Sequence, residues 1–197
     1  MAEHYFSEEP SAASRPRVVH LRLPDMNLAL SADAGVFSAG RVDPGTIALL
    51  RESSAPPASG NLLDLGCGYG PIACALARRS PGATVWGLDV NSRALELTAR
   101  NAHKLGLANL RTAAPGDVPA GIEFAGIWSN PPIRIGKQAL RELLQNWLGR
   151  LQEGASGWIV MSRHLGGDSF ASWLADQGWA VRRAASKSSY RILQVQR

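Results

Sequence analysis

The sequence has few cysteines, few lysines and no long apolar run. Cys67 and Cys74 are the only cysteines in 197 residues, and their spacing suits neither a metal site nor a disulfide-stapled secreted scaffold. No apolar stretch approaches the roughly 20 residues of a membrane span. The opening residues, MAEHYFSEEP, lack the apolar segment of a signal peptide. We therefore expect a reduced, cytoplasmic protein with no metal and no membrane partner.

The positive charge is unevenly distributed along the chain. The last 77 residues hold ten basic and five acidic side chains, which accounts for the whole net charge of +5. Clustered positive charge suits a polyanionic partner such as RNA. Arginines outnumber lysines 18 to three, however, and genome composition alone can produce that bias. With 45% hydrophobic and 19% charged residues, the composition is that of an ordinary globular protein.

The N-terminal part predicts a small structural unit of its own. After about 15 loosely ordered residues, alternation over residues 17–23 and 27–31 predicts a β-hairpin. Asp43 followed by Pro44 is a typical helix start, with Asp as the N-cap. Residues 53–60, rich in Ser, Pro and Gly, form the clearest linker. We therefore expect residues 1–59 to be an arm, hairpin and helix that pack on the remaining core.

From residue 60 to 197 the pattern alternates between strands and helices. Short apolar runs predict strands at residues 62–65, 84–88, 110–113, 122–129 and 158–162. Helices are expected from Pro71, from Asn91, over 139–151 and over 170–178, before a final hairpin of residues 179–184 and 190–195. Strands alternating with helices indicate an open, doubly wound, Rossmann-like α/β sheet.

A glycine loop, DLGCGYG at residues 64–70, lies between the first core strand and its helix. Glycines let the backbone approach a ligand closely, and a helix N-terminus offers unpaired N–H groups. Asp89 ends the next strand, where a carboxylate can accept both ribose hydroxyls of a nucleotide. A glycine loop with this acid fits NAD as well as other ligands that contain a nucleoside.

Asp64 distinguishes between these ligands. A carboxylate just before the loop would repel a pyrophosphate, whereas S-adenosylmethionine has no phosphate and carries an ammonium and a sulfonium. The spacing is also GxGxG rather than the dinucleotide pattern GxGxxG. We therefore expect S-adenosylmethionine, with a ligand-free tight turn as the alternative. Asp117, after the third core strand, either meets the adenine amino group or is an ordinary polar loop residue.

The tetrapeptide Asn130-Pro131-Pro132-Ile133 follows the fourth core strand, where open α/β sheets place their ligands. The Asn130 side-chain oxygen and the Pro131 carbonyl can accept the two hydrogens of one planar amino group. Held in this way, the nitrogen becomes tetrahedral and its lone pair is aimed at the methyl group, so no strong general base is needed. A stiff turn would explain the prolines but not the asparagine before them.

These motifs together resemble those of class I S-adenosylmethionine-dependent methyltransferases that modify planar amino nitrogens. HYFS at residues 4–7, FS at 37–38, DPGT at 43–46 and NPPIRIGK at 130–137 resemble the ribosomal RNA small-subunit methyltransferase C group. The likeness is to its short, single-domain members of the methyltransferase small domain type, and it covers essentially the whole chain.

The resemblance implies methylation of guanine N2 in 16S ribosomal RNA, free or in the small subunit, by a monomer. It also implies a seven-stranded sheet with an antiparallel C-terminal hairpin. It assigns amine alignment to Asn130 and Pro131, and we include Pro132 and Ile133 with them as catalytic candidates. It assigns the donor site to Phe37, Ser38, Asp43, Asp64, Gly66, Cys67, Gly68, Gly70, Asp89, Val90, Asp117 and Asn130.

The chain departs from the family pattern after the two prolines. Many amino methyltransferases have Phe or Tyr there, which stacks on the base, whereas Ile133 offers only apolar contact. Base binding must therefore come partly from elsewhere, and Tyr190 either stacks on a base or only packs in its strand. Arg134, Lys137 and Arg191 are candidates for RNA phosphate contacts or are ordinary surface charges.

Two alternative hypotheses stay open, one about the acceptor and one about the activity. The same chemistry could act on adenine N6 or on a protein glutamine N5. More remotely, the chain could be a non-catalytic module that binds the donor.

Overall fold

The computed structural model describes residues 13–187 and 189–197. The HYFS motif at residues 4–7 lies outside the described residues. The N-terminal part forms the antiparallel hairpin of β1 (Arg17–Leu23) and β2 (Met26–Ala32), followed by α1 (Pro44–Glu52). Asp43 caps α1, because its carboxylate accepts hydrogen bonds from the amides of Gly45 and Thr46. These elements agree with the sequence prediction.

The core alternates strands and helices as predicted. Its strands are β3 (Ser59–Leu65), β4 (Gly82–Leu88), β5 (Leu110–Ala113), β6 (Phe124–Ser129), β7 (Leu151–Ser162), β8 (Ala180–Lys187) and β9 (Tyr190–Gln196). Its helices are α2 (Pro71–Arg79), α3 (Ser92–Lys104), α4 (Lys137–Leu148) and α5 (Gly167–Asp176). Three short 3-10 turns occur at Pro115–Asp117, Ile133–Ile135 and Arg163–Leu165.

The seven core strands form one sheet in the order β5-β4-β3-β6-β7-β9-β8. Strands β3 to β7 pair in parallel, whereas β9 runs antiparallel to both β7 and β8. A Rossmann-like sheet with an antiparallel C-terminal hairpin is therefore confirmed.

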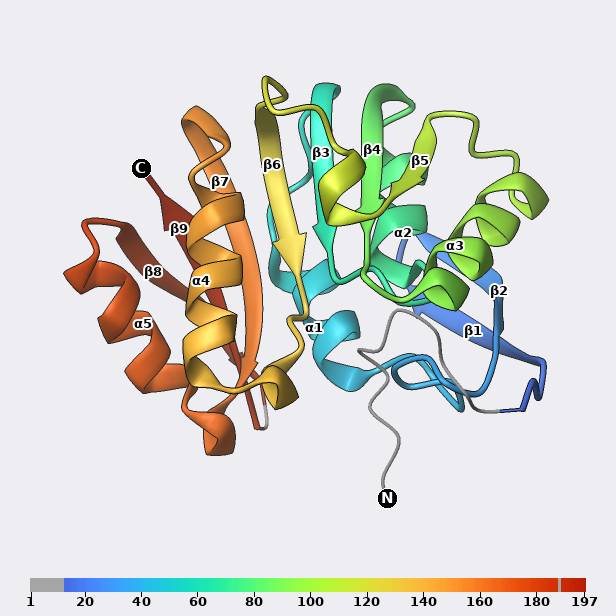
Figure 1. Ribbon diagram of the computed structural model, residues 1–197, viewed down its shortest axis with the longest axis horizontal. Coiled ribbons are helices and arrows are strands. Elements are labelled where there is room, and N and C mark those ends of the chain that lie inside the picture. The colour runs from blue at the N-terminus through green and yellow to red at the C-terminus, as the bar shows by residue number, and fades with distance from the viewer. Residues whose placement is uncertain (1–12, 188) are drawn as a thin grey trace.

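Both faces of the sheet are covered. In Figure 1, α4 and α5 lie on the near face of the sheet and α2 lies behind it. Successive strand residues face opposite sides, so Leu62 joins the cluster with α1, α2 and the N-terminal hairpin, and Leu63 joins the cluster with α4 and α5. Because both faces of the sheet are buried, the sequences of the core strands are continuous apolar runs rather than alternating apolar and polar residues.

The largest difference from the predicted element boundaries lies between α4 and β7. Leu151 was expected on the third core helix, but α4 ends at Leu148 and Leu151 begins β7, paired with Phe124. The Gly149 amide donates to the Gln145 carbonyl and ends the helix, so the apolar spacing continues across an element boundary. The strand also contains an irregularity, since the next pair is Ser156 with Gly126. The regular spacing of the leucines in the sequence could not show where the helix ends and the strand begins.

The sheet topology gathers one set of segments at a single edge. Because β3, β4 and β6 are parallel, the glycine loop, Asp89 and Asn130 all follow the same ends of these strands. The antiparallel β9 begins at that edge, where Tyr190 pairs with Ser162, the last residue of β7. Figure 1 shows α1 beside the loop after β6. Within the described part of the chain, no helix is long and apolar enough to cross a membrane.

Candidate functional site

Three adjoining hollows open at this edge of the sheet. Two narrow ones, of about 30 and 20 Å³, are here called the inner pockets. Their walls come from the segment before α1, the glycine loop, the end of β4 and the loop after β6. The lining residues are Val36, Phe37, Ser38, Asp43, Thr46, Gly66, Cys67, Gly68, Tyr69, Pro71, Ile72, Asp89, Asn91, Ala94, Asn130, Pro131 and Pro132.

The third hollow, here called the outer cleft, is wider, at about 460 Å³. It shares Phe37 and Asn130 with both inner pockets, so the three hollows adjoin one another. Its walls are Val36, Phe37, Ser38, Asp43, Asn130, Pro131, Ile133, Arg134, Ser162 and Tyr190. Burial and the nearby Asp43 carboxylate raise the pKa of Tyr190, so its phenol is neutral at physiological pH.

The glycine loop presents bare backbone to the inner pockets. Gly66 and Gly68 have φ angles of 79° and 57°, a left-handed conformation that side chains strongly disfavour. An added Cβ at Gly68 would meet nothing within 4 Å, and one at Gly66 would lie 3.7 Å from Pro132 Cδ. The loop therefore leaves open space that a ligand can enter against its backbone.

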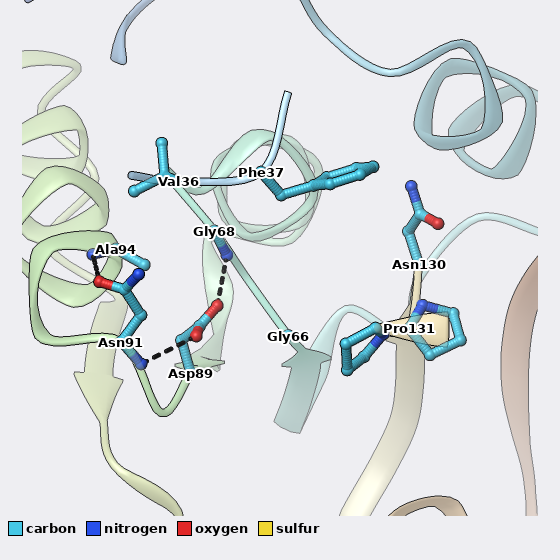
Figure 2. Close-up of a pocket in the computed structure, with 10 residues that line it drawn as sticks. Val36, Phe37, Gly66, Gly68, Asp89, Asn91, Ala94, Asn130 and Pro131 are labelled. Atoms are coloured by element: carbon cyan, nitrogen blue, oxygen red, sulfur yellow. Dashed lines mark hydrogen bonds between the residues drawn. The ribbon is translucent and has the colours of Figure 1, made fainter. Parts of the chain in front are cut away.

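Asp89 stands across the inner pockets from Asn130 (Figure 2). Its Oδ2 accepts a hydrogen bond of 2.9 Å from the Gly68 amide, and its Oδ1 accepts one of 3.0 Å from the Asn91 amide. These bonds fix the carboxylate at the pocket wall. Burial raises the pKa of Asp89 above its ordinary value in the unliganded protein.

Asp64 lies beneath the glycine loop rather than on a pocket wall. Its Oδ2 accepts a hydrogen bond of 2.8 Å from the Ala73 amide in the first turn of α2, whereas its buried Oδ1 has no partner. Burial raises the pKa of Asp64 to about 8. The carboxyl group is therefore mostly protonated and uncharged at neutral pH, and it supports the site through its hydrogen bond to α2 rather than by lining the pockets.

Asn130 is held in one orientation by side chains of the N-terminal part. Its Nδ2 donates to Asp43 Oδ1 at 2.9 Å and to Thr46 Oγ1 at 3.0 Å. The Asp43 carboxylate can only accept, so the amide nitrogen must face α1. Both amide hydrogens are thereby used, and the carboxamide oxygen remains to accept hydrogen bonds from a ligand.

Several predicted donor-site residues line none of these three hollows. Asp117 is exposed in the 3-10 turn after β5, and Val90 is 41% exposed beyond Asp89. Gly70 begins α2 and packs against Thr98. Cys67 does line an inner pocket, but burial raises the pKa of its thiol well above the ordinary value, which agrees with a space-filling role.

The three predicted phosphate contacts fall in different places. Arg134 lines the outer cleft, and Lys137 lines a neighbouring hollow together with Arg141. Arg191 forms an ion pair with Asp168 at 3.2 Å, and its side chain is only 12% exposed. The charge of Arg191 is thus directed at Asp168 and not at the outer cleft.

Thr46 and Asn91 belong to the site but were not predicted there. Thr46 stands in the DPGT motif, yet nothing in the sequence indicates that its hydroxyl meets an amide 84 positions away. Asn91 was recognised only as the cap of α3, and it also donates to the Gly35 carbonyl at 2.9 Å. Among the residues that the structure describes, no cluster of three or more His, Cys, Asp or Glu side chains could hold a metal ion.

Comparison with known proteins gives consistent matches. Residues 27–194 match the family model "Methyltransferase small domain". The chain is 34% identical over 200 residues to "Uncharacterized protein YbxB" of Bacillus subtilis, with both chains covered completely. It is 37% identical over 161 residues to "Ribosomal RNA small subunit methyltransferase C" of Pseudomonas aeruginosa, covering 80% of this chain and 48% of that protein.

A solved structure shares the fold. The "16S rRNA N2" methyltransferase RsmC of T. thermophilus, in complex with AdoMet and guanosine, superposes with a TM-score of 0.79 at 23% identity. The match covers 95% of this chain and 52% of that one, so the chain spans about half the length of its relatives named as ribosomal RNA methyltransferases. Because the family model matches residues 27–194, which is most of the chain, the chain belongs to the methyltransferase small domain family.

Proposed function

We propose that this protein transfers a methyl group from S-adenosylmethionine to an exocyclic amino nitrogen, namely guanine N2 of 16S ribosomal RNA. The observation that carries the proposal is the orientation of Asn130, whose carboxamide oxygen is left to accept hydrogen bonds where the inner pockets meet the outer cleft. The relatives named as ribosomal RNA small subunit methyltransferase C support the choice of acceptor.

The inner pockets fit a cationic donor. Among the described residues, their walls include Asp43 and Asp89 but no lysine or arginine. Carboxylates attract an ammonium or sulfonium and repel a pyrophosphate. We assign the ribose hydroxyls to Asp89 and the closest backbone approach to Gly66 and Gly68. Bound there, S-adenosylmethionine supplies an electrophilic methyl group.

The inner pockets have to widen when the donor binds. The inner pockets, of about 30 and 20 Å³, are too narrow for a nucleoside, and pockets for such ligands typically exceed about 300 Å³. Val36 and Ser38 line these pockets from a segment that belongs to no strand, so a shift of these two side chains would enlarge the space without moving the sheet.

On the acceptor side, the Asn130 oxygen and the Pro131 carbonyl would accept the two hydrogens of the amine. This arrangement favours a tetrahedral nitrogen, withdraws its lone pair from conjugation with the ring and directs it toward the methyl carbon. Transfer would form the bond between this nitrogen and the methyl carbon and break the carbon–sulfur bond of the donor, and one N–H proton would leave to solvent. Because the sulfonium drives the reaction, orientation is the main contribution of the protein.

Incubation with methyl-labelled S-adenosylmethionine and 16S ribosomal RNA, free and in small subunits, tests the proposal. Nucleoside analysis should show label in N2-methylguanosine. Label in N6-methyladenosine, or in a glutamine of a ribosomal protein, would overturn the acceptor assignment. Failure of the protein to bind S-adenosylmethionine would overturn the proposal as a whole.

A further inference from the structure

Two aromatic side chains line the outer cleft from opposite ends of the described chain. Phe37 precedes α1, and Tyr190 begins β9. Neither adjoins the Asn-Pro-Pro tetrapeptide in sequence, where the following residue is the aliphatic Ile133. The fold therefore brings aromatic rings to a cleft whose own motif provides none.

Phe37 is held at the surface by a constrained turn. It is 39% exposed, which is unusual for a large apolar side chain in this protein. Among the described residues, the following Ser38 is the only non-glycine with a positive φ, 53°, and its hydroxyl donates to the Arg41 carbonyl at 2.6 Å. A left-handed serine persists only where its surroundings enforce it. In Figure 2 the Phe37 ring extends toward Asn130.

Tyr190 is held by close packing on α1. An added Cβ at Gly45 would lie 2.7 Å from the Tyr190 ring carbon Cε1, a distance that real side chains do not allow. Glycine at this position therefore lets the ring lie against the start of α1. Because Asp43 caps the same turn and holds Asn130, the ring and the carboxamide are positioned by one element.

We propose that Phe37 and Tyr190 form an aromatic clamp for a flat heteroaromatic ring, an unpaired nucleobase turned out of its RNA strand. This inference rests on the proposed function and specifies how the acceptor is held. A cleft of about 460 Å³ has room for a base with its ribose, and aromatic side chains bind any base through its π-face. A glutamine side chain has no ring and would gain little from such walls. Extruding the base also exposes its amine to Asn130.

The free nucleoside 2-aminopurine riboside provides a direct probe. It carries an amine at the purine position of guanine N2, and stacking on an aromatic ring quenches its fluorescence. Wild-type protein and Tyr190→Phe should quench it with similar affinity, whereas Tyr190→Leu and Phe37→Leu should each bind about tenfold more weakly. Trp173→Leu is the matched control, because this half-buried aromatic residue of α5 lines none of the three hollows at the site and should leave the affinity unchanged.

Calorimetry with S-adenosylmethionine separates this inference from the proposed function. If the wild type does not bind the donor, the proposed function fails. If the donor binds and RNA is methylated, but Tyr190→Leu, Phe37→Leu and wild type share one KM for RNA and one quenching curve, the clamp is refuted. Methylation of a glutamine peptide at equal rates by all three also refutes it. If Tyr190→Leu does not fold, Phe37→Leu, at an exposed position, decides the question alone.

Discussion

The inner pockets and the outer cleft are built in different ways. The glycine loop and Asp89 follow neighbouring parallel strands, and the carboxylate is fixed by hydrogen bonds to backbone amides of Gly68 and Asn91. The outer cleft instead combines segments from before α1, after β6, and from the ends of β7 and β9. Of its wall residues, Asn130 is held by hydrogen bonds to the side chains of Asp43 and Thr46.

This difference separates the two halves of the proposed reaction. Donor binding depends mainly on the glycine loop and Asp89, two short local segments that hydrogen bonds hold together at the ends of β3 and β4. Acceptor alignment depends on α1 being correctly docked, because Asp43 both caps this helix and holds Asn130. Substitutions on one side should therefore affect one step and leave the other intact.

The largest effect is expected for Asn130→Ala. Removing one positioned hydrogen-bond acceptor should lower the methyl-transfer rate by about 10²–10³, by analogy with the loss of one oxyanion-hole donor. Single-turnover methylation with saturating donor and RNA measures this step. Donor affinity by calorimetry should be unchanged. A near wild-type rate would mean that amine alignment lies elsewhere and that the tetrapeptide is only a turn.

Asp89→Ala should produce the converse result. Losing two charge-assisted contacts to the ribose should weaken donor binding by about 2–3 kcal/mol, roughly 30–150-fold in Kd. At saturating donor, the transfer rate should recover most of its wild-type value. Asp176→Ala, at the exposed end of α5, is the control for a lost surface carboxylate. Equal donor affinity in Asp89→Ala and wild type would remove the ribose assignment.

Asp64→Asn should alter how stability depends on pH. The pKa of Asp64 is about 8 in the folded protein and near 3.8 when unfolded, so between these values only the folded state holds the proton. The contribution of Asp64 to the free energy of unfolding is complete below pH 4. It declines as the pH rises toward 8, by roughly 1.4 kcal/mol per pH unit. Urea unfolding at pH 6 and 7 should show this decline in wild type, superimposed on other titrations, and lack it in Asp64→Asn. Parallel pH profiles would contradict the assignment.

Thr46→Val tests the orientation of Asn130 with the smallest change. The substitution removes the hydroxyl that accepts from Asn130 and retains the backbone amide that Asp43 caps. Losing one of two such bonds should lower the single-turnover rate about 5–10-fold. Thr46→Ser should restore it, and donor affinity should stay constant throughout. An unchanged rate in Thr46→Val would show that Asp43 alone suffices to orient the carboxamide.

The sequence by itself determined the alternating core, the hairpin and most helix starts. Each of these follows from a local signal, such as the Asp43-Pro44 cap or the apolar strand before DLGCGYG. It also determined the donor side and the acceptor side of the site. A glycine loop after one strand and Asn-Pro-Pro after another must meet at the carboxyl edge of a parallel sheet. The boundary at Leu151 was missed because leucine spacing does not distinguish the end of a helix from the start of a buried strand.

Only the tertiary structure decided which side chains contact one another at and around the site. It placed Asp64 under the loop, paired Arg191 with Asp168, and brought Thr46 and Tyr190 beside Asn130. These contacts join residues far apart in the chain, and they depend on how α1 and β9 dock on the sheet. Side-chain partners of this kind follow from packing in three dimensions, which no local pattern of residue types encodes.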